Sequence, residues 1–145
     1  MTNSQYIDAY KKTQQSSNSV TSSHEIVRTL MKELVNSMQK IVLDIQDERK
    51  RKQGLFSVDR DFEEKYARQK SKNLSKSLSI IYGLQTSLDF DKALEIANNL
   101  FQLYEYCRHE IIKGFSQKIE EGIIKAIDVI KQIMEGWEEI PSLEK

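Results

Sequence analysis

The chain has 145 residues, 22 of them basic and 22 acidic, so its formal net charge is zero. A neutral chain has no global field that would draw it to nucleic acid or to an anionic membrane. Five glycines, one proline and 30% charged residues suit long helices and disfavour a sheet protein, which needs frequent turn residues. We therefore expect one all-α domain, long enough to bury a core without a disulfide or a metal.

Two features of the sequence indicate the cellular compartment of the protein. No segment has the apolar stretch of a signal peptide, and none approaches the roughly 18 apolar residues that a membrane-spanning helix requires. The single cysteine, Cys107, lies on the apolar face of an expected helix, which favours a small buried side chain in a reducing compartment over a nucleophile. These features predict a cytoplasmic protein without membrane insertion.

The N-terminal 23 residues divide into an apolar island and a polar connector. The island contains Ile7 and Tyr10, and residues 11–23 are rich in Ser, Thr and Gln. We expect residues 1–23 to form a mobile N-terminal segment and residues 24–145 to form the folded domain. The island is either a helical turn packed on the core or a flap over a groove. Each side chain gains about 1.5–3 kcal/mol on burial, so a flap could still yield to a longer ligand.

Four helices are expected in the domain. Ser22 and Glu25 have the spacing of a capping box, which starts a first helix that runs to about Glu48 and stops before Gly54. The second begins after Ser57 or Asp59 and continues to Leu88, the third ends near Gly114, and the fourth spans about residues 118–137. Apolar residues on each helix recur at spacings of three and four, which is typical of an antiparallel four-helix bundle. The expected seams are Val27, Met31, Leu34, Met38, Ile41 and Ile45; Leu74, Leu78, Ile81, Leu84 and Leu88; Ala93, Ala97, Leu100, Tyr104, Cys107 and Ile111; and Ile119, Ile123, Ile127, Ile130, Met134 and Trp137.

The third helix carries more apolar residues than one seam requires. A turn signal at residues 88–91 precedes it, and a second apolar stripe runs beside its seam. The stripe consists of Leu94, Ile96, Phe101, Leu103 and Ile112. This helix is therefore either buried on most sides or provides a surface for a partner.

The sequence gives little support to an enzyme, a metal site or a cofactor. Di-iron bundles need Glu-x-x-His on two helices, but His24 lies at a helix start and His109 has only Glu105 nearby in sequence. No glycine-rich phosphate loop or nucleophile elbow is present. We expect no catalytic residues, no metal ligands and no cofactor.

A basic run, Arg49 to Lys52, continues loosely through Lys65, Arg68, Lys70, Lys72 and Lys76. It permits the hypothesis of a nucleic-acid-binding bundle, although no base-stacking aromatics or recognition motif accompany it. The alternative is a solvated helix face, and cations in the last turn of a helix also suit its dipole.

Three segments in order resemble the FliS family of flagellin-specific secretion chaperones. They are the N-terminal Ile7-x-Ala9-Tyr10, the stretch SLDFDKALEIANNLFQLYEYC at residues 87–107, and Ile133-Met134-Glu135-Gly136-Trp137 followed by Ile140-Pro141. The connector at residues 48–66 is longer than is usual in the family. The resemblance implies a cytoplasmic chaperone that binds the C-terminal segment of flagellin, prevents its premature polymerisation, and assists its delivery to a cytoplasmic component of the flagellar export gate.

The resemblance also implies binding residues. Ile7 and Tyr10 match the N-terminal motif of the family, and further client contacts are expected from the second and third helices, at Ile80, Ile81, Leu84, Leu100 and Tyr104. For these five residues, plain core packing is the alternative. Two other functions stay open: a structural or regulatory bundle that self-associates through the same faces, and the small nucleic-acid-binding bundle.

Overall fold

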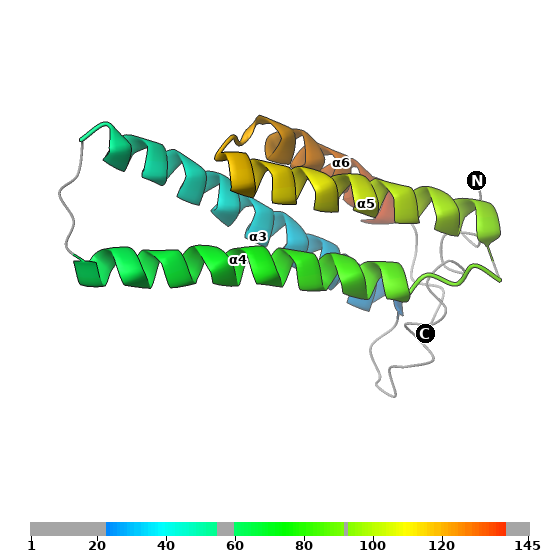
Figure 1. Cartoon of the computed structure of the whole chain (residues 1–145). Helices are drawn as coiled ribbons and strands as arrows, with labels where there is room; N and C mark the ends of the chain where they lie inside the picture. Colours follow the sequence, from blue (N-terminus) through cyan, green and yellow to red (C-terminus); the bar gives the residue numbers. More distant parts are fainter. Residues whose placement is uncertain (1–22, 55–59, 92, 139–145) are drawn as a thin grey trace.

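A computed structural model, shown in Figure 1, describes residues 23–54, 60–91 and 93–138. Every regular element in these residues is an α-helix: α3 (Ser23–Lys52), α4 (Arg60–Thr86), α5 (Leu94–Gln117) and α6 (Glu121–Glu138). The prediction of an all-α, four-helix fold is confirmed. No helix in the described ranges is long and apolar enough to cross a membrane.

The four helices form an antiparallel bundle in which α3 packs against α4 and α6, and α5 packs against the same two helices. Helices α3 and α6 are antiparallel, because the start of α3 contacts the end of α6 and the end of α3 contacts the start of α6. At one end the Nε1 of Trp137 donates to the backbone oxygen of His24, and at the other Arg49 pairs with Glu120. Helices α3 and α5 therefore lie on opposite corners of the bundle.

The hydrophobic core follows the expected seams closely. All six predicted residues of α3 are buried, as are five of the six on α5. The buried positions of α6 are Ile123, Ala126, Ile127, Ile130 and Trp137. Because each helix is amphipathic at a spacing of three and four residues, its apolar stripe turns inward when the helices pack side by side.

Helix boundaries depart from expectation by a few residues. Helix α3 continues past Glu48 to Lys52, and Gly54 then adopts a positive φ of 77°, a conformation that glycine tolerates without steric cost. The second helix ends at Thr86 rather than Leu88, because the Leu88 N–H donates to Gln85 in a turn. The predicted cap Ser22 lies outside the described residues.

The turn between α5 and α6 requires close approach of two backbones. A Cβ atom at Gly114 would lie 2.6 Å from the Cδ1 of Ile123 and 2.7 Å from the backbone oxygen of Ile119. Lys118 takes the left-handed conformation, with φ of 58°, and its N–H bonds the oxygen of Gly114. The prediction that Ile119 belongs to the buried seam is wrong. It is 49% exposed, because α6 begins only at Glu121 and Ile119 lies in the turn.

Helices α3 and α4 extend further than α5 and α6 at the end that carries the turn between α5 and α6 (Figure 1). We call residues 48–52 of α3 and 60–70 of α4 the arm; at its base, Glu48 and Arg49 still pair with Lys118 and Glu120 of that turn. Its stretch of α4 is exposed except at Tyr66 and Lys70, which are half-buried. Polar contacts connect the two helices: the Tyr66 hydroxyl donates to the backbone oxygen of Asp44, and Lys70 pairs with Glu48 at 2.9 Å.

Candidate functional site

The structure places five of the predicted binding residues in the shared hydrophobic core, three on α4 and two on α5. Their exposed fractions are 7% for Ile80, 5% for Leu100, and zero for Ile81, Leu84 and Tyr104. Ile7 and Tyr10 lie outside the described residues. In this arrangement the five side chains stabilise the bundle by burial, and a ligand reaches them only if neighbouring elements move.

Helix α5 nevertheless presents apolar side chains to solvent. Leu94 is 61% exposed, Ile112 39%, Tyr106 38% and Leu103 36%. We call these four residues the outer α5 surface. Of the second stripe noticed in the sequence, only Ile96 is buried, and Phe101 is half-buried. The interpretation that α5 provides a surface is therefore favoured over burial on most sides.

Helical geometry divides the outer α5 surface into two flanks. Leu94 and Ile112 lie a whole number of turns apart on the side toward α4, together with the half-buried Phe101 of the same stripe. Leu103 and Tyr106 lie on the other side, toward α6, where Tyr106 and Lys125 line the same pocket. Tyr106 was not among the predicted residues, whereas Leu94, Leu103 and Ile112 belong to the second stripe, for which a partner surface was one of the two expectations. The signal was available in the sequence as apolar residues at positions that the core seam does not use.

A polar bridge fixes the flank toward α4. The Nε2 of the buried Gln85 donates to the Glu105 carboxylate at 2.9 Å and to the backbone oxygen of Phe101 at 3.3 Å. Glu105 also accepts two hydrogen bonds from Arg108. The hydrogen bonds from Arg108 and Gln85 lower the pKa of Glu105 from 4.5 to about 2. Glu105 is thus ionised at neutral pH and holds α4 and α5 in register.

The corner between α4 and α5 is the segment that the sequence singled out. Leu88 is buried, the Asp89 side chain accepts from the Asp91 N–H at 3.0 Å, and Phe90 meets Phe101 edge to face at 6.1 Å between ring centroids. The Asp side chain satisfies backbone groups of the turn, as is common in such turns. The aromatic pair then secures the start of α5 against the corner.

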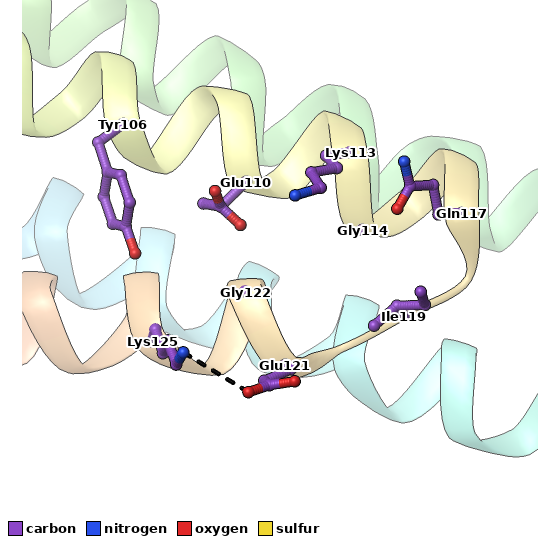
Figure 2. A pocket seen from close by; sticks show the side chains of 9 residues that line it. All are labelled: Tyr106, Glu110, Lys113, Gly114, Gln117, Ile119, Glu121, Gly122 and Lys125. Carbon is purple, nitrogen blue, oxygen red and sulfur yellow. Dashed lines mark ion pairs between the residues drawn. The ribbon is translucent and has the colours of Figure 1, made fainter.

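A pocket of about 360 Å³ opens between α5 and α6 at their connecting turn (Figure 2). Its lining includes Glu110 and Lys113 from α5 and Glu121 and Lys125 from α6, and the last two form an ion pair at 3.5 Å. Glu110 extends toward Gly122, where a Cβ atom would collide with its carboxylate. The mixed charges and open shape make this pocket unlike the apolar clefts that hold cofactors.

Cys107 and His24 have structural roles. Cys107 is fully buried, and burial raises the pKa of its thiol to about 12, so it is not a thiolate nucleophile at neutral pH. The His24 ring stacks on Trp137, and its Nε2 lies 2.9 Å from the Trp137 backbone oxygen. Among the residues that the structure describes, no three His, Cys, Asp or Glu side chains are grouped as metal ligands.

The fold and the outer α5 surface define a four-helix bundle that presents apolar side chains to solvent. Comparison with known proteins identifies the family: the profile of the family described as "Flagellar protein FliS" matches residues 6–144. The chain belongs to the FliS family. The resemblance seen in the sequence is thereby confirmed over nearly the whole chain.

Two relatives carry the name flagellar secretion chaperone FliS. The protein of Vibrio cholerae is 29% identical over 136 residues, which cover 93% of this chain and 88% of that protein. The protein of Salmonella typhimurium is 33% identical over 72 residues, which cover 49% of this chain and 53% of that protein. No solved structure matches the chain significantly.

Proposed function

We propose that this chain is a non-enzymatic export chaperone that binds the C-terminal segment of flagellin in the cytoplasm. In this role it prevents premature polymerisation and assists delivery to a cytoplasmic component of the flagellar export gate. Membership of the FliS family carries the proposal, together with relatives named flagellar secretion chaperones. The exposed apolar side chains of α5 support it, because a bundle that needed no partner would gain by burying or replacing them.

The mechanism needs binding alone. A client segment that is disordered when free would fold into helices along the bundle, bury on the order of 1,000–3,000 Å², and lose roughly 2–5 kcal/mol to ordering. Its own association surface would then be covered. Amphipathic client helices would place residues at spacings of three and four against Leu94, Leu103, Tyr106 and Ile112.

The binding residues expected from the sequence belong to the same proposal. Ile7 and Tyr10 would contact or compete with the client. The buried group of Ile80, Ile81, Leu84, Leu100 and Tyr104 would meet the client only in a bundle that has opened between α4 and α5. In the closed bundle these five residues form part of the hydrophobic core, so their replacement would affect stability before affinity.

The test is calorimetric titration of the full chain with a peptide of about 40 residues, roughly 60 Å of helix, from the C-terminus of flagellin of the same organism. Titration at two temperatures gives the heat-capacity change. One-to-one binding with a large negative heat-capacity change is expected, because apolar surface is buried. A scrambled peptide of the same composition is the control. No binding by calorimetry and by fluorescence anisotropy would refute the proposal.

Variants locate the contact. Leu103→Ser with Ile112→Ser removes apolar area from the outer α5 surface, and the expected result is clearly weaker peptide binding with only a small decrease in melting temperature. Leu43→Ser is the matched control, since Leu43 is 56% exposed on α3. Equal effects of the two changes would assign the client to another face. A concentration-dependent dimer in sedimentation, lost in the α5 variant, would favour the self-associating bundle instead.

A further inference from the structure

Burial along α4 is uneven. The structure describes residues 60–79 throughout, and only two of them, Asn73 and Ser77, are buried. Both are polar. We call residues 60–79 the first part of α4 and residues 80–86 its end. The buried apolar residues of α4 all belong to the end: Ile80, Ile81 and Leu84. Apolar burial therefore holds the end of α4 in the core and contributes less along its first part.

Helix α3 is anchored differently beside the first part of α4. The Nδ2 of Asn73 donates to the Asp44 carboxylate at 2.9 Å, which sets the two helices level at these residues. Around Asp44, buried apolar side chains hold α3 in the core: Met38, Ile41, Val42 and Ile45. Helix α3 also packs against α6. The position of α3 therefore does not depend on the first part of α4.

The contacts of the first part of α4 with α3 include three polar ones that water can replace. The Tyr66 hydroxyl donates to the backbone oxygen of Asp44, Lys70 pairs with Glu48 at 2.9 Å, and Asn73 donates to Asp44. Such contacts lose little free energy when both partners become hydrated. Desolvation also raises the pKa of the Asp44 carboxyl, so this carboxylate regains favourable hydration when α4 moves away.

Ser77 is a weak point in the core. Among the described residues, its Oγ is the one buried side-chain oxygen or nitrogen without a hydrogen-bond partner. By the antiparallel register of the helices, Ser77 lies about level with Ile41 of α3 and Ile111 of α5, which are both buried. A hydroxyl in an apolar layer is unfavourable and gains a hydrogen bond when water reaches it. Leu74 and Leu78, beside Ser77, are only half-buried.

We propose that the first part of α4 acts as a flap. It opens about a hinge before Ile80, while the end of α4 and the other three helices stay packed. Opening hydrates the polar groups of the first part and uncovers the apolar layer of Ile41 and Ile111. Exposure of that layer keeps the open state a minor population until a partner covers it. The flap is then an entry to the core for a client helix, a consequence that rests on the proposed function.

Hydrogen exchange of the full chain, measured by mass spectrometry, tests the flap. Residues 71–79 are the informative segment, because they lie beyond the arm and so distinguish the flap from opening of the arm alone. Their amides should exchange at least about tenfold faster than those of residues 80–86, since they open without global unfolding. Residues 38–45 of α3 should be as protected as residues 80–86.

A pair of serine variants tests the cause of the opening. Ser77→Ala removes the unpartnered hydroxyl, and Ser79→Ala, at an exposed position of the same helix, is the matched control. Both changes raise helix propensity equally, which should slow exchange of residues 71–79 by about twofold. Ser77→Ala should slow it by about tenfold, because the closed state no longer contains an unsatisfied buried group.

A reversible lock tests the consequence for a client. Asp44→Cys/Asn73→Cys places two thiols where short side chains now meet, and Cys107 is buried away from them. The disulfide-bonded protein is compared with the same protein after reduction. Oxidation should bring the exchange of residues 71–79 to the level of residues 80–86. It should also slow association of the flagellin C-terminal peptide by at least about tenfold, because entry requires the open state.

Three results would overturn the proposal. Residues 71–79 and 80–86 could be equally protected, with fast exchange confined to the arm. The two serine variants could slow exchange equally. The locked and reduced proteins could exchange alike. Unchanged peptide association in the locked protein would overturn the entry route. A wild type that does not bind the peptide would refute the proposed function, while exchange still decides the flap. If the disulfide does not form, wild-type exchange and the serine pair decide.

Discussion

The closed bundle and the arm are held together by different forces, although α4 runs through both. In the bundle, α4 buries Ile80, Ile81 and Leu84 where it packs against α3 and α5. In the arm it has only α3 as a neighbour, and its contacts are ion pairs, hydrogen bonds and cation–π contacts. Arg51 lies over the rings of both Tyr66 and Phe62, with its Cζ 3.5 Å and 4.9 Å from their centroids.

The difference shows that helix length and helix stability are separate properties. Apolar burial scales with the area removed from water and changes little with salt. Exposed ion pairs contribute little and are screened. A continuous helix can therefore contain a part that unfolds only with the whole protein and a part that opens locally. Four changes test this comparison.

The largest effect is expected from Tyr104→Ala in the bundle. Tyr104 is fully buried, so its loss leaves a cavity and should reduce the free energy of unfolding by about 3–5 kcal/mol, as for other large aromatic residues. Phe62→Ala in the arm, where the ring is 48% exposed, should cost less than about 1 kcal/mol. Guanidinium unfolding measures both. A Tyr104 variant that kept its stability but lost client binding would show that this ring faces the client.

Two glycines should respond to alanine with opposite signs. Gly114→Ala introduces a Cβ into the contact with Ile123 and Ile119, and overpacking of this kind costs about 1–3 kcal/mol. Gly83→Ala meets no atom within 4 Å in α4 and should stabilise by about 0.5–1 kcal/mol, because alanine favours the helix. Thermal unfolding of both variants gives the signs. A stable Gly114 variant would mean that the turn between α5 and α6 can widen without loss.

A smaller and local effect is expected from Arg51→Ala. The change removes the guanidinium from Tyr66 and Phe62, a loss of about 0.5–1 kcal/mol for each such contact at a surface site. Hydrogen exchange should accelerate at residues 60–70 and stay unchanged at residues 80–86. Lys50→Ala, an exposed neighbour, is the control. Uniform acceleration along α4 would mean that the arm and the bundle unfold together.

The smallest changes in the free energy of unfolding are expected when the pH is lowered, and they differ between the bundle and the arm. The pKa of Glu105 is lowered in the folded bundle, so its contribution is present above its unfolded value of 4.5 and is lost as pH falls toward about 2. Desolvation raises the pKa of Asp44 near the base of the arm, so protonation there favours the folded state. Urea unfolding across this pH range should show less acid sensitivity in Glu105→Gln than in the wild type. Identical profiles would show that Glu105 does not contribute to the acid dependence of stability.

The sequence predicted the helices well, because the apolar residues of α3 and α5 recur without interruption at spacings of three and four. Only one face of each helix can therefore point toward the core. The sequence did not decide whether the second stripe of α5 is buried or exposed, and two of its members differ, since Ile96 is 4% and Leu103 36% exposed. Helical rotation alone decides between them, and rotation follows from packing with α4 and α6. Contacts such as Gln85 with Glu105 join residues 20 apart, and no local pattern announced them.

Because Cys107 is the only cysteine of the chain and is buried, the reactivity of its thiol reports on opening of the bundle. Its Sγ lies 3.8 Å from the backbone oxygen of Ala126, at the contact between α5 and α6. An alkylating reagent can reach the thiol only when these two helices separate. If alkylation is slow compared with reclosing of the helices, the labelling rate is proportional to the population of the separated state. The unmodified protein can thus be followed by mass spectrometry, free and with a client added, to learn whether binding closes the bundle or opens it.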